Sequence, residues 1–348
     1  MPEMTIEGWH DAISTGHQTL LDAALAAGVP VPHQCRAGEC GTCKCRLLRG
    51  EVERRSNLPA ALSAEERAED WILSCRTVAR SNVSVAFAEP LRAPVPPQQK
   101  CQGHVKFCET VSRDVVRLVL QLNRPLEFFA GQYVALRFPG YPERSFSPAN
   151  TPGSRFLEFY VRVLPDGVVS QHISRHVSPG DRADIVGPFG QAYQSDCPQG
   201  PLLLAGGGTG LAPMLSILRH VAARAPRVPV TLYVGFRTTA DLFAGEPLRA
   251  LSARLPALQV ITVLSDEATD EYRVGFVAPV ILEDQADLSR HQIFIAGPPP
   301  LVDSVRDAAI ERGAKPQSIY ADPFLATSDA NETSRPSRFG RWLKFGIG

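Results

Sequence analysis

The sequence predicts three domains of different classes: a small α+β domain, an antiparallel β-barrel, and an α/β domain with a parallel sheet. Five of the eight cysteines lie between Cys35 and Cys75. Four prolines fall within residues 90–99, a composition typical of an extended, semi-rigid linker. Short strands separated by turns occupy residues 103–163, which favours a barrel. Beyond residue 200, apolar strands alternate with helical segments, which is the pattern of a parallel sheet covered by helices.

Composition and charge exclude several classes of protein. The 348 residues hold 36 basic and 36 acidic side chains, so the formal net charge is zero, and 44% of residues are hydrophobic. Disorder requires few apolar residues and a high net charge, and a general nucleic-acid-binding protein is normally basic. No run of about 18 apolar residues predicts a membrane-spanning helix, and the first residues do not resemble a signal peptide. We therefore expect a cytoplasmic protein whose clustered cysteines bind metal.

The cysteine spacing in the first domain, residues 4–90, is that of a metal site. Cys35-x4-Cys40-x2-Cys43, followed by Cys75 after 31 intervening residues, is the plant-type pattern for the ligands of a [2Fe–2S] cluster. Two irons bridged by sulfides need four thiolates that converge within a few ångströms. A zinc site is the alternative, but zinc motifs favour paired Cys-x2-Cys units, and this sequence has one.

Neighbouring residues agree with an iron–sulfur loop. Gly38 and Gly41 lie between the ligands, where small residues allow the left-handed or crowded backbone that wraps a cluster. Cys45 is the rival ligand, and we expect it to pack as a small apolar side chain instead. Ser63, with Glu three residues later, predicts a capping box that opens a short helix. Residues 4–90 thus resemble a plant-type ferredoxin with a β-grasp fold. We interpret the remaining scattered cysteines as structural: Cys101, Cys108 and Cys197.

A linker is predicted over residues 91–102, and the barrel over residues 103–198. The barrel carries two motifs, Arg144-Ser145-Phe146-Ser147 and Gly167-Val168-Val169-Ser170. An arginine can bind a phosphate through charge-assisted hydrogen bonds, and an aromatic ring can stack on a flat heterocycle. The glycine turn offers backbone N–H groups at a helix start, which is a ready anion site. The predicted strands of the barrel cover residues 104–107, 115–121, 132–138 and 157–163.

In this order, the two motifs resemble those of the flavin domain of the ferredoxin–NADP reductase superfamily. The resemblance implies that Arg144 contacts the flavin phosphate, that Phe146 stacks on the isoalloxazine ring, and that Ser147 is a catalytic hydrogen-bond partner near N5. Phe146 stands where the superfamily usually has Tyr. FAD is expected rather than FMN, because in this family an N-terminal ferredoxin domain accompanies FAD.

The third domain, residues 199–325, is predicted to bind a nucleotide. An apolar strand at 201–205 leads into Gly206-Gly207-Gly208-Thr209-Gly210 and then a helix from 211 to 224. Glycines let the backbone approach a pyrophosphate at a helix N-terminus. Gly297-Pro298 follows a second strand, at the carboxyl end where ligands bind in such sheets. Further strands are expected at 230–234, 258–264 and 293–296, and further helices near 246–254, 278–286 and 300–312.

These glycine motifs are similar to the pyridine-nucleotide motifs of the same superfamily. Ala296 stands where the superfamily usually has Cys, and Phe324 matches its terminal aromatic residue, which lies near the flavin ring and is the second catalytic candidate. Arg237 is the one cation in the segment 235–242, where a coenzyme 2′-phosphate would need several basic or hydroxyl groups. Asp241 would repel that phosphate, so the predicted coenzyme is NADH.

Residues 326–348 extend beyond the part that resembles the superfamily. On a helix, Phe339, Trp342 and Leu343 would share one face, with basic residues largely opposite. This pattern suits a membrane surface or an acidic partner, and a disordered tail is the alternative.

Nearly all of the chain before residue 326 resembles the reductase component of bacterial multicomponent oxygenases, such as the xylene, toluene, phenol and benzoate oxygenase reductases. The resemblance implies electron transfer from NADH through FAD and the [2Fe–2S] cluster to a terminal oxygenase, a hydroxylase or an intermediate ferredoxin. Two alternatives stay open at this point: a reductase that serves a deoxysugar dehydratase, and a non-catalytic iron–sulfur redox sensor.

Overall fold

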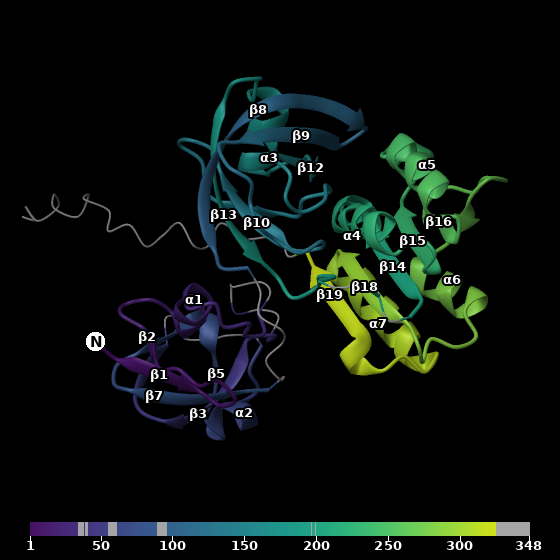
Figure 1. Ribbon diagram of the computed structural model, residues 1–348. Helices are drawn as coiled ribbons and strands as arrows, with labels where there is room; N and C mark the ends of the chain where they lie inside the picture. The colour runs from purple at the N-terminus through teal and green to yellow at the C-terminus, as the bar shows by residue number, and fades with distance from the viewer. Residues whose placement is uncertain are drawn as a thin grey trace, which may run out of the picture.

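The computed structural model describes residues 1–33, 38, 41–54, 61–88, 96–195, 197–198 and 200–324, and these form three domains (Figure 1). We call them the N-terminal domain (residues 1–88), the barrel domain (96–198) and the C-terminal domain (200–324). The predicted ligands Cys35 and Cys40 and the predicted tail at 326–348 lie outside the described residues. Among the described helices, none has the length and apolar character that crossing a bilayer requires.

The N-terminal domain is an α+β unit built on a five-stranded sheet of order β2-β1-β7-β3-β5. β1 and β7 run parallel, and the other neighbouring strands are antiparallel. Thr19 caps the first helix by accepting a hydrogen bond from the Asp22 amide, and Ser63 and Glu66 form the predicted capping box of the second. The elements are β1 (Glu3–Ile6), β2 (Ile13–Ser14), α1 (Leu20–Ala26), β3 (Lys44–Arg49), β4 (Val52–Arg54), α2 (Ala64–Ala68), β5 (Trp71–Leu73), β6 (Thr77–Ala79) and β7 (Val83–Phe87).

The barrel domain is antiparallel throughout, with strand order β11-β10-β13-β8-β9-β12. Its first strand begins at Gln99, inside the predicted linker. Helix α3 begins at Val168, two residues before the helical stretch that the sequence predicts over 170–177. Alternate side chains of the strands form the core, as expected for an antiparallel sheet with one face packed inwards. The elements are β8 (Gln99–Ser112), β9 (Val115–Leu122), β10 (Tyr133–Arg137), β11 (Arg144–Phe146), β12 (Phe156–Arg162), α3 (Val168–Arg175) and β13 (Arg182–Phe189).

The C-terminal domain is a parallel six-stranded sheet of order β17-β16-β15-β14-β18-β19, covered by helices as predicted. Its central strand β14 is buried at every residue, which explains the continuous apolar run in the sequence. The elements are β14 (Leu202–Gly207), α4 (Leu211–Arg224), β15 (Val230–Phe236), α5 (Gly245–Arg254), β16 (Leu258–Leu264), β17 (Arg273–Val274), α6 (Val277–Asp284), β18 (Gln292–Gly297), α7 (Pro299–Glu311) and β19 (Ile319–Pro323).

The cores of the three domains are connected unequally. One apolar cluster joins the barrel residues Val115, Ala149 and Tyr160 to helix α4 and the central strands of the C-terminal domain. The core of the N-terminal domain, by contrast, consists wholly of residues from that domain. Helix α4 lies between the barrel and the parallel sheet, in the position that this shared core requires (Figure 1).

Candidate functional site

The cluster site is carried by the segments that flank strands β3 and β5. Cys43 directly precedes β3, and Cys75 lies in the short 3₁₀ turn that follows β5. The two strands pair with Lys44 opposite Leu73, so the ladder brings both cysteines together. Their sulfur atoms are 3.2 Å apart, and both side chains are buried. Two of the four predicted ligands therefore converge as an iron–sulfur cluster requires.

The loop glycines and Cys45 behave as the sequence predicts. Gly38 has φ +89° and Gly41 has φ +72°, both in the left-handed region that favours glycine. A Cβ atom at Gly38 would also lie 2.9 Å from Cγ of Arg76, so the loop has no room for a side chain there. Cys45 is fully buried in the core of the N-terminal domain, and burial raises the pKa of its thiol. This confirms that Cys45 packs as a core residue.

The first barrel motif lies on the edge strand β11, which pairs with β10. Phe146 packs against the barrel core, with its ring centroid 6.1 Å from that of Phe159. Ser147 is buried directly after the strand, whereas Ser145, within the strand, is exposed. Arg144 is half-buried and donates a hydrogen bond of 2.9 Å to the Glu143 carbonyl oxygen.

The second barrel motif forms the turn that opens α3. The Ser170 hydroxyl accepts a hydrogen bond from the Leu164 amide and donates one to the Gly167 carbonyl oxygen, both at 3.1 Å. A Cβ atom at Gly167 would lie 2.4 Å from Oγ of Ser170, so glycine is required for this closure. The amides of residues 168–170 lie in the first helical turn, where N–H groups have no acceptor within the helix. They remain suited to an anion.

A contact that the sequence did not predict joins these two motifs. The Tyr141 ring stacks on the His172 ring with centroids 3.7 Å apart and an interplanar angle of 17°. Tyr141 lies three residues before Arg144, and His172 lies two residues after Ser170 in α3. The stacking thus brings the arginine segment beside the glycine turn, as one binding site for an anionic ligand requires. Tyr141 lies in a loop, where an aromatic residue carries no periodic signal, so the sequence offers no means to pair it with His172.

The two glycine motifs of the C-terminal domain meet at the carboxyl ends of adjacent strands. β14 pairs with β18 so that Gly206 is opposite Ala296. A Cβ atom at Gly210 would lie 2.1 Å from the Ala296 carbonyl oxygen, and one at Gly297 would lie 3.0 Å from the Gly207 amide nitrogen. Glycine is therefore imposed by close backbone approach, and Gly297 also has φ +140°. The motifs form one continuous backbone surface at the start of α4, where helix amides suit a pyrophosphate.

Phe324 is attached to this surface. Its amide donates a hydrogen bond of 2.7 Å to the Gly297 carbonyl oxygen, and its ring packs against the core shared with the barrel domain. Ala296 is fully buried beside it. The last described residue is thus held at the junction of the two domains.

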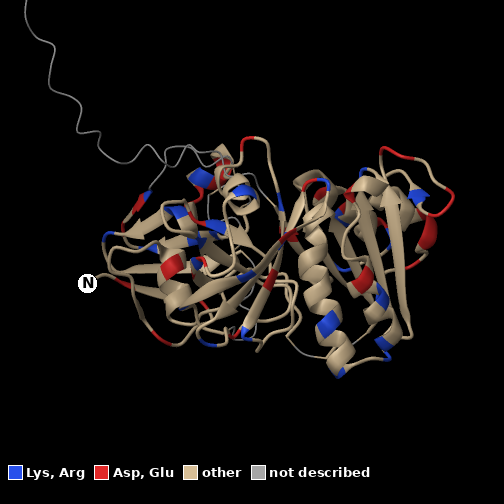
Figure 2. Ribbon diagram, turned by 90° about the horizontal axis from the view of Figure 1, so that it is seen from above, with Lys and Arg blue, Asp and Glu red and all other residues tan. Residues whose placement is uncertain are grey.

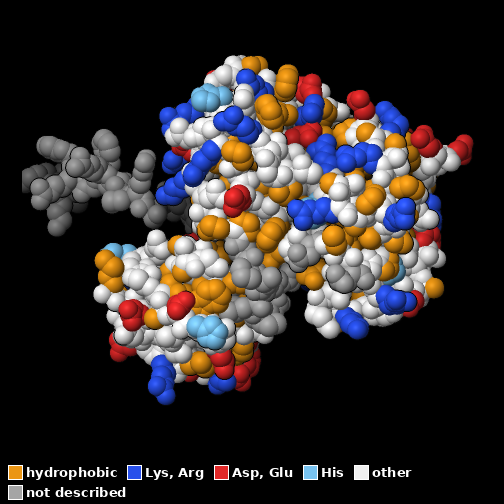
Figure 3. All heavy atoms as spheres, in the orientation of Figure 1, with side chains coloured by type: hydrophobic (Ala, Val, Ile, Leu, Met, Phe, Trp, Pro, Cys, Tyr) orange, Lys and Arg blue, Asp and Glu red, His pale blue; other side chains and the backbone are white. Residues whose placement is uncertain are grey.

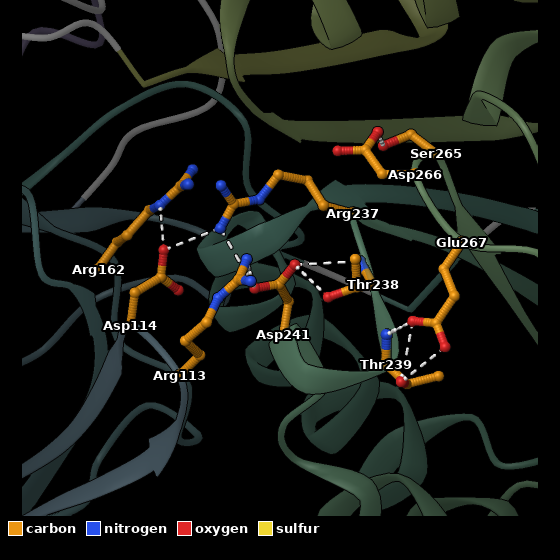
Figure 4. A network of polar contacts seen from close by, with 10 residues as sticks. All are labelled: Arg113, Asp114, Arg162, Arg237, Thr238, Thr239, Asp241, Ser265, Asp266 and Glu267. Carbon is orange, nitrogen blue, oxygen red and sulfur yellow. Dashed lines mark hydrogen bonds and ion pairs between the residues drawn. The ribbon is translucent and has the colours of Figure 1, made fainter.

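Arg237 lies at the carboxyl end of β15, inside a network of charges (Figure 4). It donates hydrogen bonds to Asp241 at 3.2 Å and to Asp114 of the barrel domain at 3.1 Å. Burial alone would raise the pKa of Asp241, but hydrogen bonds from Thr238 and the charges of Arg237 and Arg113 hold that pKa below its usual value. The sequence indicated Arg237 and Asp241. It did not indicate Arg113 and Asp114 of the barrel domain, because they are distant from Arg237 in the chain.

The family matches follow the same three domains. The model for the 2Fe-2S iron–sulfur cluster binding domain matches residues 6–80. The model for the oxidoreductase FAD-binding domain matches residues 102–193, and that for the oxidoreductase NAD-binding domain matches residues 204–307.

Curated relatives and solved structures cover almost the whole chain. A reductase component of naphthalene 1,2-dioxygenase/salicylate 5-hydroxylase systems from Ralstonia sp. is 34% identical, covering 88% of this chain and 93% of the relative. The reductase subunit of an aromatic O-demethylase from Amycolatopsis sp. is 35% identical, covering 89% and 95%. The crystal structure of an Amycolatopsis cytochrome P450 reductase aligns with a TM-score of 0.86 and 34% identity, covering 93% of this chain and 99% of the other. The chain therefore belongs to the ferredoxin–NAD(P)⁺ reductase components of oxygenase systems, oxidoreductases whose cofactors are a [2Fe–2S] cluster, FAD and a nicotinamide nucleotide.

Proposed function

We propose that this protein takes electrons from NADH and passes them through FAD and the [2Fe–2S] cluster to the terminal oxygenase, or to an intermediate ferredoxin, of an aromatic or hydrocarbon oxygenase system. The observation that carries this proposal is a direct link between the barrel domain and the cluster loop. The Gly190 amide donates a hydrogen bond of 3.2 Å to Nε2 of His33, and the Gln191 side-chain amide donates one of 2.9 Å to the Val31 carbonyl oxygen. His33 lies two residues before the predicted ligand Cys35.

Each binding segment has a defined task under this proposal. When bound, FAD accepts an electron pair with a proton as hydride and releases electrons singly, which the cluster carries one at a time. Arg144 and the amides of residues 168–170 would hold the flavin phosphates. Phe146 and Phe324 would offer aromatic surface to the flat ring, and Ser147 would supply a hydroxyl that can donate or accept a hydrogen bond.

The nucleotide surface positions NADH against that ring. Backbone N–H groups of Gly206, Gly207, Gly208, Thr209 and Gly210, at the start of the 14-residue helix α4, hold the pyrophosphate. Gly297 and Pro298 support the nicotinamide end, beside Phe324. The shared core keeps the two domains in fixed register, which supports hydride transfer because this step tolerates little misplacement.

The first experiment measures NADH-dependent reduction of the bound flavin and of cytochrome c. Wild-type protein should do both, and Ser147→Ala should slow flavin reduction about tenfold, the equivalent of one hydrogen bond of about 1.4 kcal/mol. Ser145→Ala is the matched control, because Ser145 is exposed within strand β11. A protein that reduces neither acceptor with NADH is a redox sensor, and the proposal is then wrong.

The partner is an oxygenase component, as in the relatives. The Ralstonia relative is named as serving naphthalene dioxygenase and salicylate hydroxylase systems, and the Amycolatopsis relative as serving an aromatic O-demethylase. The charge of the N-terminal domain supports docking of a partner with a basic surface, because residues 1–90 hold nine basic and twelve acidic residues, a net charge of −3. In the face shown in Figure 3, both signs lie on the N-terminal domain, and basic side chains gather over the barrel among a few acidic ones. Figure 2 shows both signs interspersed over the described residues. Reconstituted NADH-dependent substrate oxidation with the neighbouring-gene oxygenase tests the pairing.

Two further elements of the proposal rest on the sequence. The protein is cytoplasmic, and the segment 326–348 contacts a membrane surface or an acidic partner. Deletion of residues 326–348 should reduce sedimentation with anionic vesicles or turnover with the oxygenase. Unchanged values in both measurements would contradict the docking role.

A further inference from the structure

The charge network around Arg237 crosses from the barrel domain into the C-terminal domain (Figure 4). Arg113 and Asp114 form the turn between β8 and β9, and Arg237 directly follows β15. Arg113 donates a hydrogen bond of 2.7 Å to Asp241, and its backbone amide donates one of 3.2 Å to the Ala240 carbonyl oxygen. The tip of the β8–β9 hairpin is therefore docked directly onto the segment that follows β15.

Asp114 is the barrel residue that acts on Arg237. Its carboxylate oxygen Oδ2 accepts from Nη2 of Arg237 and from Nε of Arg162, both at 3.1 Å. The Asp114 side chain is 25% exposed and the Arg237 side chain 44%, so the pair is partly shielded from water. Asp241, with 7% exposure, accepts from the same Arg237 nitrogen. One guanidinium nitrogen is thus shared between two carboxylates from two domains.

The hydroxyl groups beside Arg237 are occupied in the same way. The Thr238 amide and hydroxyl donate to Oδ2 of Asp241 at 3.0 and 3.1 Å. The Thr239 amide and hydroxyl donate to the carboxylate of Glu267, which follows β16, at 2.6 to 3.0 Å. Every residue from 237 to 239 thus has a carboxylate partner for a polar group that could otherwise bind a phosphate.

This position has a defined place in a nucleotide-binding sheet. β14 carries the glycine turn, and β15 is its neighbour in the sheet. In such sheets the segment after the second strand lies at the adenosine ribose, where an acidic residue suits a free 2′-hydroxyl and an arginine accommodates a 2′-phosphate. Arg237 is the cation of this segment, and each arginine of the network, Arg113 and Arg162 included, is already paired with Asp114 or Asp241. A 2′-phosphate would therefore have to displace a carboxylate to reach Arg237.

We propose that Asp114, carried by the barrel domain, is a specificity-determining residue of the neighbouring nucleotide site, which holds Arg237 in an ion pair and so excludes coenzymes with a 2′-phosphate. The proposal rests on the proposed function, because it presupposes that a pyridine nucleotide binds along β14 and β15. Asp114 is a positioning residue that acts through Arg237. Discrimination between coenzymes thereby depends on the docking of two domains.

The test compares two probes on the flavin-loaded protein by titration calorimetry: ADP-ribose and ADP-ribose 2′-phosphate. Asp114→Asn should improve the affinity for the 2′-phosphate probe about fivefold, since Arg237 gains a charge-assisted contact at a partly exposed site. The affinity for ADP-ribose should stay within about twofold. The ratio of kcat/KM for NADPH to that for NADH should rise by the same factor, and Asp114→Glu should restore the wild-type ratio.

The matched control is Asp184→Asn. Asp184 also accepts from two arginines, Arg137 at 3.1 Å and Arg182 at 3.2 Å, on strands of the same barrel. Asp184→Asn therefore also removes one carboxylate that accepts from two arginines. The affinities for both probes should stay unchanged. The double variant Asp114→Asn/Arg237→Ala should lose the gain.

Three results would overturn the proposal. The ratio of the affinities for the two probes could be unchanged in Asp114→Asn, or it could change equally in Asp184→Asn. The third is that the gain in affinity for ADP-ribose 2′-phosphate survives the removal of Arg237. In each of these cases wild-type binding of ADP-ribose leaves the proposed function standing. If wild-type protein binds neither probe, and NADH does not reduce the flavin, then both the proposed function and this inference are wrong.

Discussion

The barrel domain meets its two neighbours in different ways. Towards the C-terminal domain it shares a continuous apolar core and an ion cluster around the buried Glu158, which accepts from Arg117 and Arg219, both at 2.7 Å. Towards the N-terminal domain, the contact includes the hydrogen bonds of His33 and Val31, and the N-terminal core stays separate.

The difference follows from what each junction has to do. Hydride transfer requires two reacting atoms in contact, so the flavin and nucleotide domains need a fixed geometry. Electron transfer to a cluster and onward to a second protein does not require contact between reacting atoms. A domain with its own core can serve that step and still present its surface to a partner. The predictions below test this contrast, from the largest expected effect to the smallest.

Cys75→Ser should remove the cluster and abolish electron output to cytochrome c, because serine does not replace the thiolate ligand. NADH-dependent flavin reduction should stay within about twofold, since the core shared by the other two domains contains no N-terminal residue. Iron and sulfide analysis and the visible spectrum measure the first effect, and stopped-flow absorbance measures the second. Cys45→Ala is the control and should retain its iron; loss of iron there would make Cys45 the ligand.

Glu158→Gln should lower the free energy of unfolding of the barrel and C-terminal domains by about 3 kcal/mol, because it leaves two arginines without their buried charge partner. Urea unfolding at pH 7 measures this change. Glu109→Gln is the matched control: Glu109 also pairs with Arg117, but its side chain is 53% exposed, so a loss below about 0.5 kcal/mol is expected. If the two variants lost the same free energy of unfolding, the burial of Glu158 would not strengthen its ion pairs, and the prediction would be wrong.

The same carboxylate gives the junction a pH dependence. Burial raises the pKa of Glu158, but the charge of Arg219 and the hydrogen bonds from Arg117 and Arg219 outweigh it and hold the pKa below its usual value. A depressed folded-state pKa contributes stability above the unfolded value of about 4.3, and this stability is lost as pH falls through the folded value. Wild-type protein should therefore lose more stability between pH 6 and acid pH than Glu158→Gln, which lacks the titrating group.

Gly210→Ala should destabilise the C-terminal domain by about 2 kcal/mol and weaken NADH binding, because its Cβ atom would meet the Ala296 carbonyl oxygen at 2.1 Å. Leu211 and Ala296 belong to the shared core, so the displacement should extend to the barrel junction. Gly208→Ala is the control: φ is +54° there, but no atom lies within 4 Å, so about 1 kcal/mol of strain is expected. Thermal unfolding and NADH titration compare the stability and the NADH affinity of the two variants. A larger loss of stability in Gly208→Ala than in Gly210→Ala would be inconsistent with the close approach of Gly210 to Ala296.

At the junction, His33→Ala should have the smallest effect, about 1 kcal/mol, because the hydrogen bond that the Gly190 amide donates to Nε2 is lost. The second hydrogen bond of His33, between Nδ1 and the Val31 carbonyl oxygen, lies within the N-terminal domain. Amide hydrogen exchange at Gly190 should accelerate about fivefold, the exchange equivalent of that energy, while helix α1 keeps its protection. His10→Ala, at an exposed position of the same domain, should leave exchange at Gly190 unchanged. Faster exchange throughout α1 would mean that His33 supports the N-terminal core instead of the junction.

Local patterns explain how much of the fold was predicted. The strand over 115–121 and the helix from 211 to 224 follow from continuous periodic signals. Helix α3 begins earlier than predicted because Val168 and Val169 are β-branched and weaken the helical signal. β19 was not predicted because it is short and ends in Pro323, which argues against a strand unless it lies at the edge of a sheet.

The sequence by itself determined the chemistry. Cysteine spacing and glycine turns are short-range patterns, and each one specifies its ligand within a few tens of residues. Only the tertiary structure decided how the domains act on one another. Asp114 and Arg237 are 123 residues apart, and His33 and Gly190 are 157 apart. Single polar residues at such separations have no periodicity, and their pairing depends on how folded surfaces dock. The physical reason is that a domain's core is patterned along the chain, whereas the contacts between domains depend on three-dimensional proximity alone.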